Sequence, residues 1–212
     1  MTIEEPAADE AEPRPRGPGR PRDAGRDRAI LIATLKILFD KGYAGLSIES
    51  VAAKAGVGRP TIYRRWRSKA ALVVAALLES ERVAIPEIDT GALRSDLIKL
   101  QRHQVELMNS PASRRVTAGL VADLAADPEL SQIYVSQYLV PRRAAVAQVL
   151  QRGIDRGELA TDADLDFIYD LLLGPLFMRA VVWGHPLTPE AAERSAEVVL
   201  AAFAAKPRRK TA

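Results

Sequence analysis

Beyond Asp23, the apolar residues of this chain recur at helical spacing, and strand patterns are scarce. Ala and Leu dominate, while β-branched residues seldom alternate with polar ones as they do in half-buried strands. The chain has 212 residues, 48% of them hydrophobic, so it can bury one substantial core, or one core with a small module attached. These features predict an all-α protein.

Caps and helix breakers predict where the helices begin and end. Gly42 suits the left-handed position after a first helix, and Ser47 and Ser68 suit the N-caps of a second and a fourth. In the N-terminal part, the predicted helices span residues 26–41, 48–54, 59–66 and 69–83. Five more are predicted at 92–108, 112–126, 129–156, 163–183 and 189–205. Pro141 and the pair Gly174-Pro175 predict kinks inside two of these five.

The net charge of +3 hides a strong segregation of charge along the chain. Residues 1–13 carry five acidic residues, whereas residues 14–69 carry 14 basic and four acidic ones, a net charge of +10. Residues 70–205 have a net charge of −6, and four basic residues follow in the tail at 206–212. A basic segment beside an acidic body is typical of a module that binds a polyanion. A merely solvated basic surface is the alternative.

The basic segment contains two short predicted helices, separated by the turn at residues 55–58 and preceded by a leading helix. This is the pattern of a helix-turn-helix motif, in which the second helix protrudes into the major groove of DNA. Ile62 and Trp66, four residues apart in that helix, are predicted to face the core. The side chains then predicted to point outward are Arg59, Thr61, Tyr63, Arg64 and Arg65.

Residues 39–73 resemble the DNA-binding region of TetR-family repressors. The resemblance rests on Gly42-Tyr43, on Gly56-Val57 in the turn, and on Thr61-Ile62-Tyr63 followed by Ser68-Lys69. It implies a three-helix DNA-binding domain at 23–70, joined by a long helix to a C-terminal helical domain at 71–205 that binds an effector and dimerises. Outside residues 39–73 the chain fits the family mainly in its length and helical character.

The resemblance also implies roles for individual residues. The implied base-facing residues are Arg59, Pro60, Thr61 and Arg64. The implied phosphate contacts come from Ser47, Tyr63, Arg65 and Lys69, the last lying at a helix N-terminus. Glu49 departs from the family pattern, and two roles are open for it. It stabilises the start of its helix, which we favour, or it accepts a hydrogen bond from cytosine.

Residues 1–22 form an arm with few large apolar side chains, so they are predicted to be disordered when free. Gly19-Arg20-Pro21 with its flanking arginines resembles the core of an AT-hook, which lays arginines into a narrow A·T minor groove. We therefore expect Arg16, Arg20 and Arg22 to contact the minor groove. A flexible solubilising tail is the alternative.

One short recognition helix reads too few base pairs to find an operator, so a homodimer on a palindromic site is expected. In the TetR family the last two large helices form the dimer contact, and both are rich in apolar or small residues here. The candidate interface residues are Leu172, Leu176, Ala192, Ala196, Val199 and Phe203. Ordinary core packing is the alternative for either helix alone.

Soft and aromatic side chains on the C-terminal helices are candidates for lining an effector pocket. They are His103, Met108, Tyr134, Tyr138, Phe177 and Met178. A lining of this kind favours a small lipophilic effector. For each residue taken singly, plain core packing is the stronger interpretation.

Several classes of function find no support in the sequence. The chain has no cysteine and two histidines, and it lacks nucleotide-binding glycine patterns, so we expect neither an enzyme, nor a metal site, nor a cofactor. The most apolar run, residues 171–183, is shorter than the roughly 20 residues of a membrane span. No targeting segment is evident, so a cytoplasmic protein without a membrane partner is expected.

Taken together, these patterns predict a sequence-specific transcriptional regulator. In this interpretation a dimeric repressor binds double-stranded operator DNA and is released by a small effector. A non-specific architectural DNA-binding protein, which uses the arginine-rich arm, is the alternative.

Overall fold

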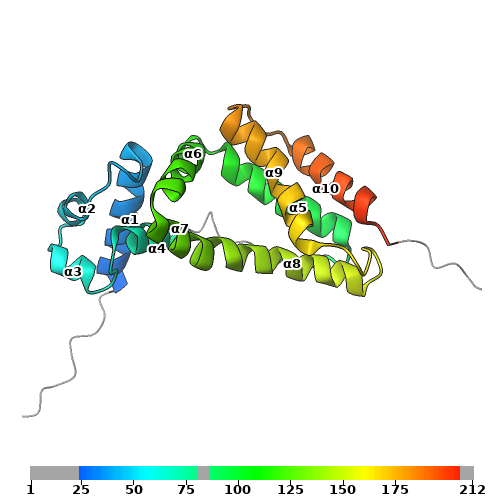
Figure 1. Cartoon of the computed structure of the whole chain (residues 1–212), viewed down its shortest axis with the longest axis horizontal. Coiled ribbons are helices and arrows are strands. Elements are labelled where there is room, and N and C mark those ends of the chain that lie inside the picture. The colour runs from blue at the N-terminus through cyan, green and yellow to red at the C-terminus, as the bar shows by residue number, and fades with distance from the viewer. Residues whose placement is uncertain (1–23, 81–85, 206–212) are drawn as a thin grey trace, which may run out of the picture.

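The structure, a computed structural model, describes residues 24–80 and 86–205. Its α-helices are α1 (Ala24–Lys41), α2 (Ile48–Ala55), α3 (Arg59–Tyr63), α4 (Lys69–Glu79), α5 (Leu93–Asn109), α6 (Pro111–Ala126), α7 (Pro128–Tyr134), α8 (Val140–Asp155), α9 (Leu165–Phe177) and α10 (Pro189–Phe203). Two π-helical segments, Val135–Leu139 and Met178–Val182, continue α7 and α9. Figure 1 shows α1–α3 at one end of the molecule and α9 and α10 at the other, with α6 and α7 between them. The prediction of an all-α protein is confirmed.

Helices α1–α4 pack around one apolar cluster. Ile30, Val51, Ile62 and Leu72 are each fully buried in it, one from each helix. Gly42 has a φ of 70° and donates its N–H to the carbonyl of Leu38, so it ends α1 in the left-handed conformation that was predicted. The leading helix of the predicted motif is thereby packed against both of its short helices.

The same cluster continues into the next part of the chain. Leu120 of α6 and Leu130 of α7 are buried in it, and Tyr134 and Tyr138 pack against its edge. The helices predicted to bind DNA therefore share a core with the helices that lead into the C-terminal part. A movement of α6 or α7 changes the packing of α1 and α4 directly.

Both predicted kinks coincide with π-helical turns. Pro141 has no N–H to donate, and in the turn before it the N–H of Val140 bonds to Val135, five residues back. Pro175 lies inside α9, and the N–H of Trp183 bonds to Met178 over the same five-residue step. The predicted helices 129–156 and 163–183 are thus each continued through a π-helical turn, which ends two residues before Pro141 in the first and begins three residues after Pro175 in the second.

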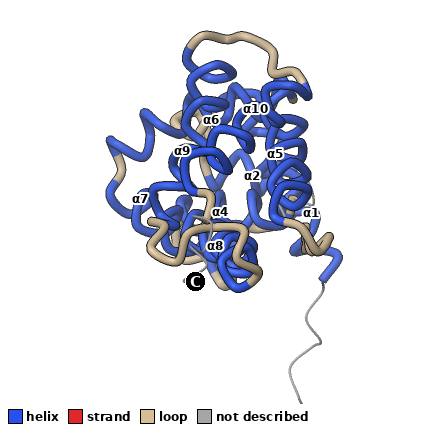
Figure 2. Tube along the Cα trace, turned by 90° about the vertical axis from the view of Figure 1, so that its right-hand side faces the viewer, coloured by secondary structure: helices blue, strands red, loops and turns tan. Residues whose placement is uncertain are grey.

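Helices α5, α8, α9 and α10 surround a second cluster, in which Leu97, Leu150, Ile168 and Val199 are buried. Figures 1 and 2 place α5 beside α10, and these two helices pack along much of their length. Figure 1 shows α8 running along one side of the molecule below α5 and α9, and Figure 2 views it nearly end-on. An isolated β-bridge between Leu159 and Ala204 ties the loop after α8 to the end of α10.

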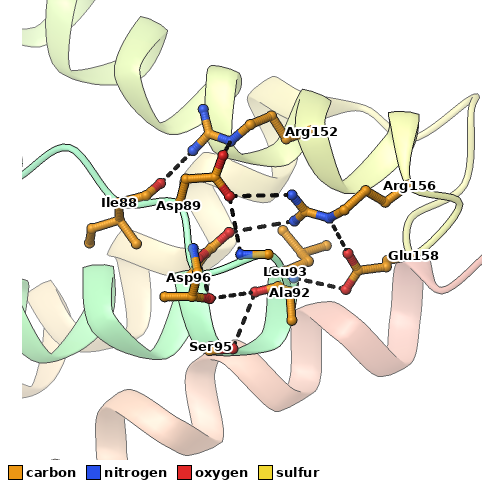
Figure 3. Close-up of polar contacts among 11 residues, drawn as sticks. Ile88, Asp89, Ala92, Leu93, Ser95, Asp96, Arg152, Arg156 and Glu158 are labelled. Carbon is orange, nitrogen blue, oxygen red and sulfur yellow. Dashed lines mark hydrogen bonds and ion pairs between the residues drawn. The ribbon is translucent and has the colours of Figure 1, made fainter.

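A polar network fixes the start of α5 against the end of α8 (Figure 3). Asp96, which is fully buried, accepts hydrogen bonds from the N–H and hydroxyl of Thr90 at 2.7 and 2.6 Å. Arg156 of the α8 C-terminus bonds to the other oxygen of Asp96 at 3.4 Å, and Glu158 accepts the N–H of Leu93 at 2.8 Å. The Ala92 side chain cannot cap α5, and Glu158 instead accepts the first N–H of the helix, that of Leu93.

Candidate nucleic-acid interface and effector cavity

Capping residues, a glycine and a proline define where the two helices of the motif begin and end. The hydroxyl of Ser47 accepts the N–H of Ser50, whose own hydroxyl accepts the N–H of Ser47, so α2 starts with a reciprocal capping box. Gly56 ends α2 with a φ of 66°, a conformation that few other residues adopt without strain. Pro60 lies in the first turn of α3, where its missing N–H costs nothing. The predicted capping by Ser47 is confirmed.

Helix α3 presents most of the predicted residues to solvent. Ile62 is fully buried and Trp66 packs against the same cluster, as the four-residue spacing predicted. Arg59, Pro60, Tyr63 and Arg64 are exposed, and Thr61 is half-buried. The helix ends at Tyr63, earlier than predicted, because the N–H groups of Arg65 and Trp66 both turn back to the carbonyl of Ile62.

Arg59 forms an ion pair with Glu49 on the surface of the motif. Its Nη1 lies 2.9 Å from Oε1 of Glu49 on α2, and both side chains are more than half exposed. The hydrogen bond from Arg59 is the largest of the effects that hold the pKa of Glu49 below its usual range, so the carboxylate stays charged at neutral pH. The departure from the family pattern at Glu49 thus places a negative charge beside the leading candidate for base recognition.

Arg65 differs from its predicted outward orientation. Its Nη1 lies 2.6 Å from Oδ2 of Asp27 in the first turns of α1, and its side chain is only 23% exposed. The early end of α3 turns this residue toward α1, where it joins the motif to its leading helix. Its contact with phosphate remains a prediction, and it requires this ion pair to be shared or exchanged.

Lys69 connects the motif to α7 through Tyr43. Its Nζ donates to the carbonyl of Tyr43 at 3.2 Å and lies 3.8 Å from the centre of the Tyr43 ring. The Tyr43 hydroxyl donates to Oδ2 of Asp127 at 2.8 Å, and Asp127 is the N-cap of α7. The N–H of Leu130 and the Tyr43 hydroxyl lower the pKa of Asp127, whereas burial and this carboxylate raise that of Tyr43. Sequence reasoning missed this bridge, which joins residues far apart in the chain.

The predicted minor-groove residues Arg16, Arg20 and Arg22 lie outside the described residues, as does the basic tail at 206–212.

Four of the six candidate pocket residues line one cavity. Met108, Tyr134, Tyr138 and Phe177 surround a cavity of about 230 Å³ between α5, α6, α8 and α9. His103 lines a smaller, adjoining cavity of about 40 Å³. The prediction that Met178 lines the pocket is wrong, because Met178 lies on the outer side of the π-helical turn after α9 and is 42% exposed. Sequence reasoning missed Gln104, Arg142 and Tyr169, which line both cavities.

The predicted dimer residues lie mainly in the core of the protomer and not on its surface. Leu172, Leu176, Ala192, Ala196 and Val199 are buried inside the protomer, at most 4% exposed, so they are not available to a second copy. They face α5 and each other across the core, and Phe203 lies edge-on to Phe167. The exposed apolar residues of the same region lie on the opposite sides of these helices: Phe167, Met178, Val182, Trp183 and Val198.

An α2–turn–α3 unit held by α1 and α4, with cationic and polar side chains exposed on α3, defines a helix-turn-helix DNA-binding protein. Residues 30–76 match the family model described as bacterial regulatory proteins of the tetR family. Residues 87–199 match the model of the tetracyclin repressor-like C-terminal domain. The chain belongs to the TetR family and is a transcription regulator rather than an enzyme. Within the described residues, no helix is both long and apolar enough to cross a membrane.

Relatives of this chain share most of its length. An uncharacterized HTH-type transcriptional regulator of Mycobacterium tuberculosis is 34% identical over 176 residues, which cover 82% of this chain and 86% of that protein. The DNA-binding transcriptional repressor TetR of Mycobacteroides abscessus is 32% identical, with coverage of 77% and 86%. The crystal structure of the TetR family transcription regulator SCO0332 is similar with a TM-score of 0.67 at 27% identity, covering 83% of this chain and 97% of that one.

Proposed function

We propose that the protein is a homodimeric repressor, which binds a palindromic operator through α2 and α3 and is released by a small lipophilic effector. In this proposal residues 23–70 bind DNA, residues 71–205 bind the effector and dimerise, and the arm at 1–22 adds minor-groove contacts. The relative from Mycobacteroides abscessus, named a transcriptional repressor, supports the direction of regulation.

The surface of α3 is the observation that carries the proposal. Ile62 buries the apolar side of α3 completely in the core. The polar side chains of Arg59, Tyr63 and the C-cap residue Arg64 are therefore exposed to solvent. Lys69 lies at the start of α4, where the cation and the positive end of the helix together favour a phosphate, which would share Nζ with the carbonyl of Tyr43. Base reading and phosphate anchoring thus come from adjacent segments, as in other helix-turn-helix proteins.

The exposed apolar face of α9, its π-helical extension and α10 supports the homodimer. Phe167, Val182, Trp183 and Val198 are each more than half exposed. A groove between α9 and α10 opens on this face, and it is lined by apolar residues such as Leu171, Pro175 and Val198 and by charged ones such as Arg179 and Arg194. Exposed large apolar side chains beside such a groove support an interaction surface, and a second copy of the chain brings the two recognition helices onto one operator.

Selection of bound sequences from random double-stranded DNA tests the proposal. Full-length protein is expected to enrich one palindrome, with half-sites one or more helical turns apart. Footprinting on the enriched sequence then shows a single protected region. Enrichment of no sequence, with uniform coating of the DNA, contradicts the proposal and favours the architectural alternative.

Two substitutions separate base reading from phosphate anchoring. Arg59→Ala is expected to cost about 1–3 kcal/mol on the selected operator and little on random DNA. Lys69→Ala weakens binding to both and reduces the salt dependence by about one counterion. Equal losses on both DNAs for Arg59→Ala contradict its assignment to a base.

A further inference from the structure

The two adjoining cavities of the C-terminal part differ in character. The larger one, of about 230 Å³, is walled mainly by apolar and aromatic side chains, among them Leu120, Leu139 and Phe177. The smaller one, of about 40 Å³, contains Gln101 and His103. Gln104, Arg142, Tyr169 and Leu173 line both, so the polar compartment opens off one wall of the apolar one. A site with this division fits an amphipathic molecule.

The polar compartment is cationic and rich in hydrogen-bond donors. Arg142 donates from Nη2 to Oε1 of Gln104 at 3.3 Å, and its guanidinium carbon lies 5.2 Å from the centre of the Tyr138 ring. Tyr169 also lines this compartment, and burial raises the pKa of its phenol, which is a hydrogen-bond donor at neutral pH. Among the described residues that line the two cavities, none is Asp or Glu.

His103 adds an unsatisfied polar atom. Its Nε2 is buried and has no hydrogen-bond partner among the described residues. A buried polar atom without a partner costs free energy in the empty protein, and a ligand that bonds to it recovers that cost. The neighbouring Gln101 is already engaged, because its Nε2 donates to the carbonyl of Leu172 and to the Ser195 hydroxyl.

The apolar compartment favours a flat ligand. Tyr134 and Tyr138 both line it, and they stack with their ring centres 4.7 Å apart and their planes 17° from parallel, an arrangement that an aromatic ligand can join. Phe177 and Leu173 lie on α9 and belong to the same lining. An aromatic or otherwise planar apolar body covers such a wall with more contact than a branched one.

We infer that the effector is an organic anion, with a planar apolar body in the larger cavity and a carboxylate or similar acidic group in the smaller one. The acidic group accepts charge-assisted hydrogen bonds from Arg142 and a hydrogen bond from the Nε2–H group of His103. The inference rests on the proposed function, because it names the chemical class of the effector at that same site.

The position of Tyr138 gives such a ligand a route to the DNA-binding helices. Tyr138 also lines a third cavity, of about 190 Å³, together with Leu35 and Phe39 of α1 and Leu77 of α4. A ligand body that displaces this ring therefore changes the packing of α1 and α4, which hold α3 in place.

A matched pair of fluorescent dyes tests the inference on the full-length protein. 1-Anilinonaphthalene-8-sulfonate carries an acidic group on a planar aromatic body, and N-phenyl-1-naphthylamine has the same body without that group. Fluorescence titration of the wild type is expected to show the sulfonate binding at least about tenfold more tightly than the neutral dye. Equal affinities, or tighter binding of the neutral dye, overturn the inference of an anion.

Substitutions assign the difference to the polar compartment. Arg142→Met is expected to weaken the sulfonate about tenfold and to change the neutral dye less than twofold, whereas Arg142→Lys retains most of the preference. Arg143→Met is the matched control, because Arg143 is the next residue of α8 but pairs with Asp166 and Asp170 and lines neither cavity. Loss of both dyes in equal measure with Arg142→Met shows a structural role and overturns the inference.

A cavity-filling variant separates this inference from the proposed function. Leu173 lines both cavities, so Leu173→Trp is expected to abolish binding of both dyes. If both dyes bind Leu173→Trp as they bind the wild type, neither occupies the cavity, and the proposed effector site fails with the inference. If Leu173→Trp excludes both dyes but Arg142→Met does not reduce the preference for the sulfonate, only the inference about the acidic group fails.

Discussion

Arg59 has two competing partners, Glu49 in the free protein and a base in the proposed complex. The ion pair with Glu49 is solvent-exposed, and exposed pairs of this kind contribute little to stability. A bidentate hydrogen-bonded contact between arginine and guanine in the major groove is stronger. Exchange of Glu49 for the base is therefore favourable for Arg59. Because the ion pair must first be broken, Glu49 still lowers the affinity for DNA.

Glu49→Gln is expected to tighten DNA binding. The substitution removes both the ion pair that must be broken and a negative charge close to the phosphates, so affinity rises by roughly two- to fivefold on operator and on random DNA alike. Fluorescence anisotropy at a fixed salt concentration measures this change. Glu106→Gln, an exposed position on α5, is the matched control. Weaker binding confined to operators with cytosine at one position shows instead that Glu49 accepts a hydrogen bond from that base.

Asp96→Ala is expected to lower the free energy of unfolding by about 1–3 kcal/mol, because it removes a fully buried carboxylate that accepts hydrogen bonds from the N–H and hydroxyl of Thr90 and from the Arg156 guanidinium. Asp89→Ala in the same network costs at most about 1 kcal/mol, since Asp89 is 55% exposed and its ion pairs are 3.5 and 3.6 Å long. Urea unfolding followed by circular dichroism compares the two. Similar losses from both substitutions argue that Asp96 acts only as one of several surface charges.

At the scale of the elements, side-chain caps define the starts of α2, α4 and α7. Ser47, Ser68 and Asp127 each accept a backbone N–H from the first turn of the helix that they precede. The position of α3 depends on two of these caps, because α2 precedes it by one tight turn and α4 follows it within a few residues.

Ser47→Ala is expected to destabilise the protein by about 1 kcal/mol, the usual value of an N-cap. Ser47→Asn restores most of this loss, because its side-chain oxygen accepts the same N–H. Thermal unfolding measures the series, with Ser136→Ala, an exposed hydroxyl inside a helical segment, as the control. A Ser47→Ala variant as stable as the wild type means that the capping box does not contribute, and its role is then confined to DNA.

The caps show which parts of this structure can be predicted from sequence. Helix starts at Ser47 and Ser68 and the inward side of α3 depend on residues a few positions apart, so local patterns predicted them. The π-helical turns were not predicted, because a proline indicates only that a hydrogen bond is lost and not how the turn adapts. The pairs Arg65–Asp27 and Tyr43–Asp127 depend on tertiary packing, which no local pattern reveals.

The sequence did not indicate which side of α10 is buried within the protomer. α10 carries small or apolar residues on two sides, with Ala192, Ala196 and Val199 on one and Ala191, Val198 and Ala202 elsewhere. Helical spacing identified a stripe but did not indicate which stripe meets α5 of the same chain. Likewise, aromatic residues predicted the apolar wall of the candidate effector cavity, whereas Arg142 is one of two adjacent arginines after Pro141, and the local sequence does not indicate which of the two faces the cavity.

For the molecule as a whole, the continuous core from α1 through α7 joins the DNA-binding helices to the cavity, and the α9–α10 face lies at the far end. In the proposed function, release from DNA by the effector therefore depends on contacts within the protomer and between protomers. A change at the cavity would reach the DNA-binding helices through Tyr138, Asp127 and Tyr43, and in a dimer this change would alter the spacing of the two α3 helices.

Val198→Glu is expected to convert the proposed dimer into a monomer. Val198 is 58% exposed at the groove between α9 and α10, and in a two-fold contact through this face the substitution buries a carboxylate from each copy. Light scattering at micromolar concentration measures the mass, and operator affinity is expected to fall at least tenfold because each half-site is then bound alone. Val140→Glu, a 54% exposed valine on α8, is the matched control and should remain dimeric. A dimeric Val198→Glu variant with unchanged operator affinity would show that the second copy docks on another face, and the exposed residues of α9 and α10 would then need a different partner.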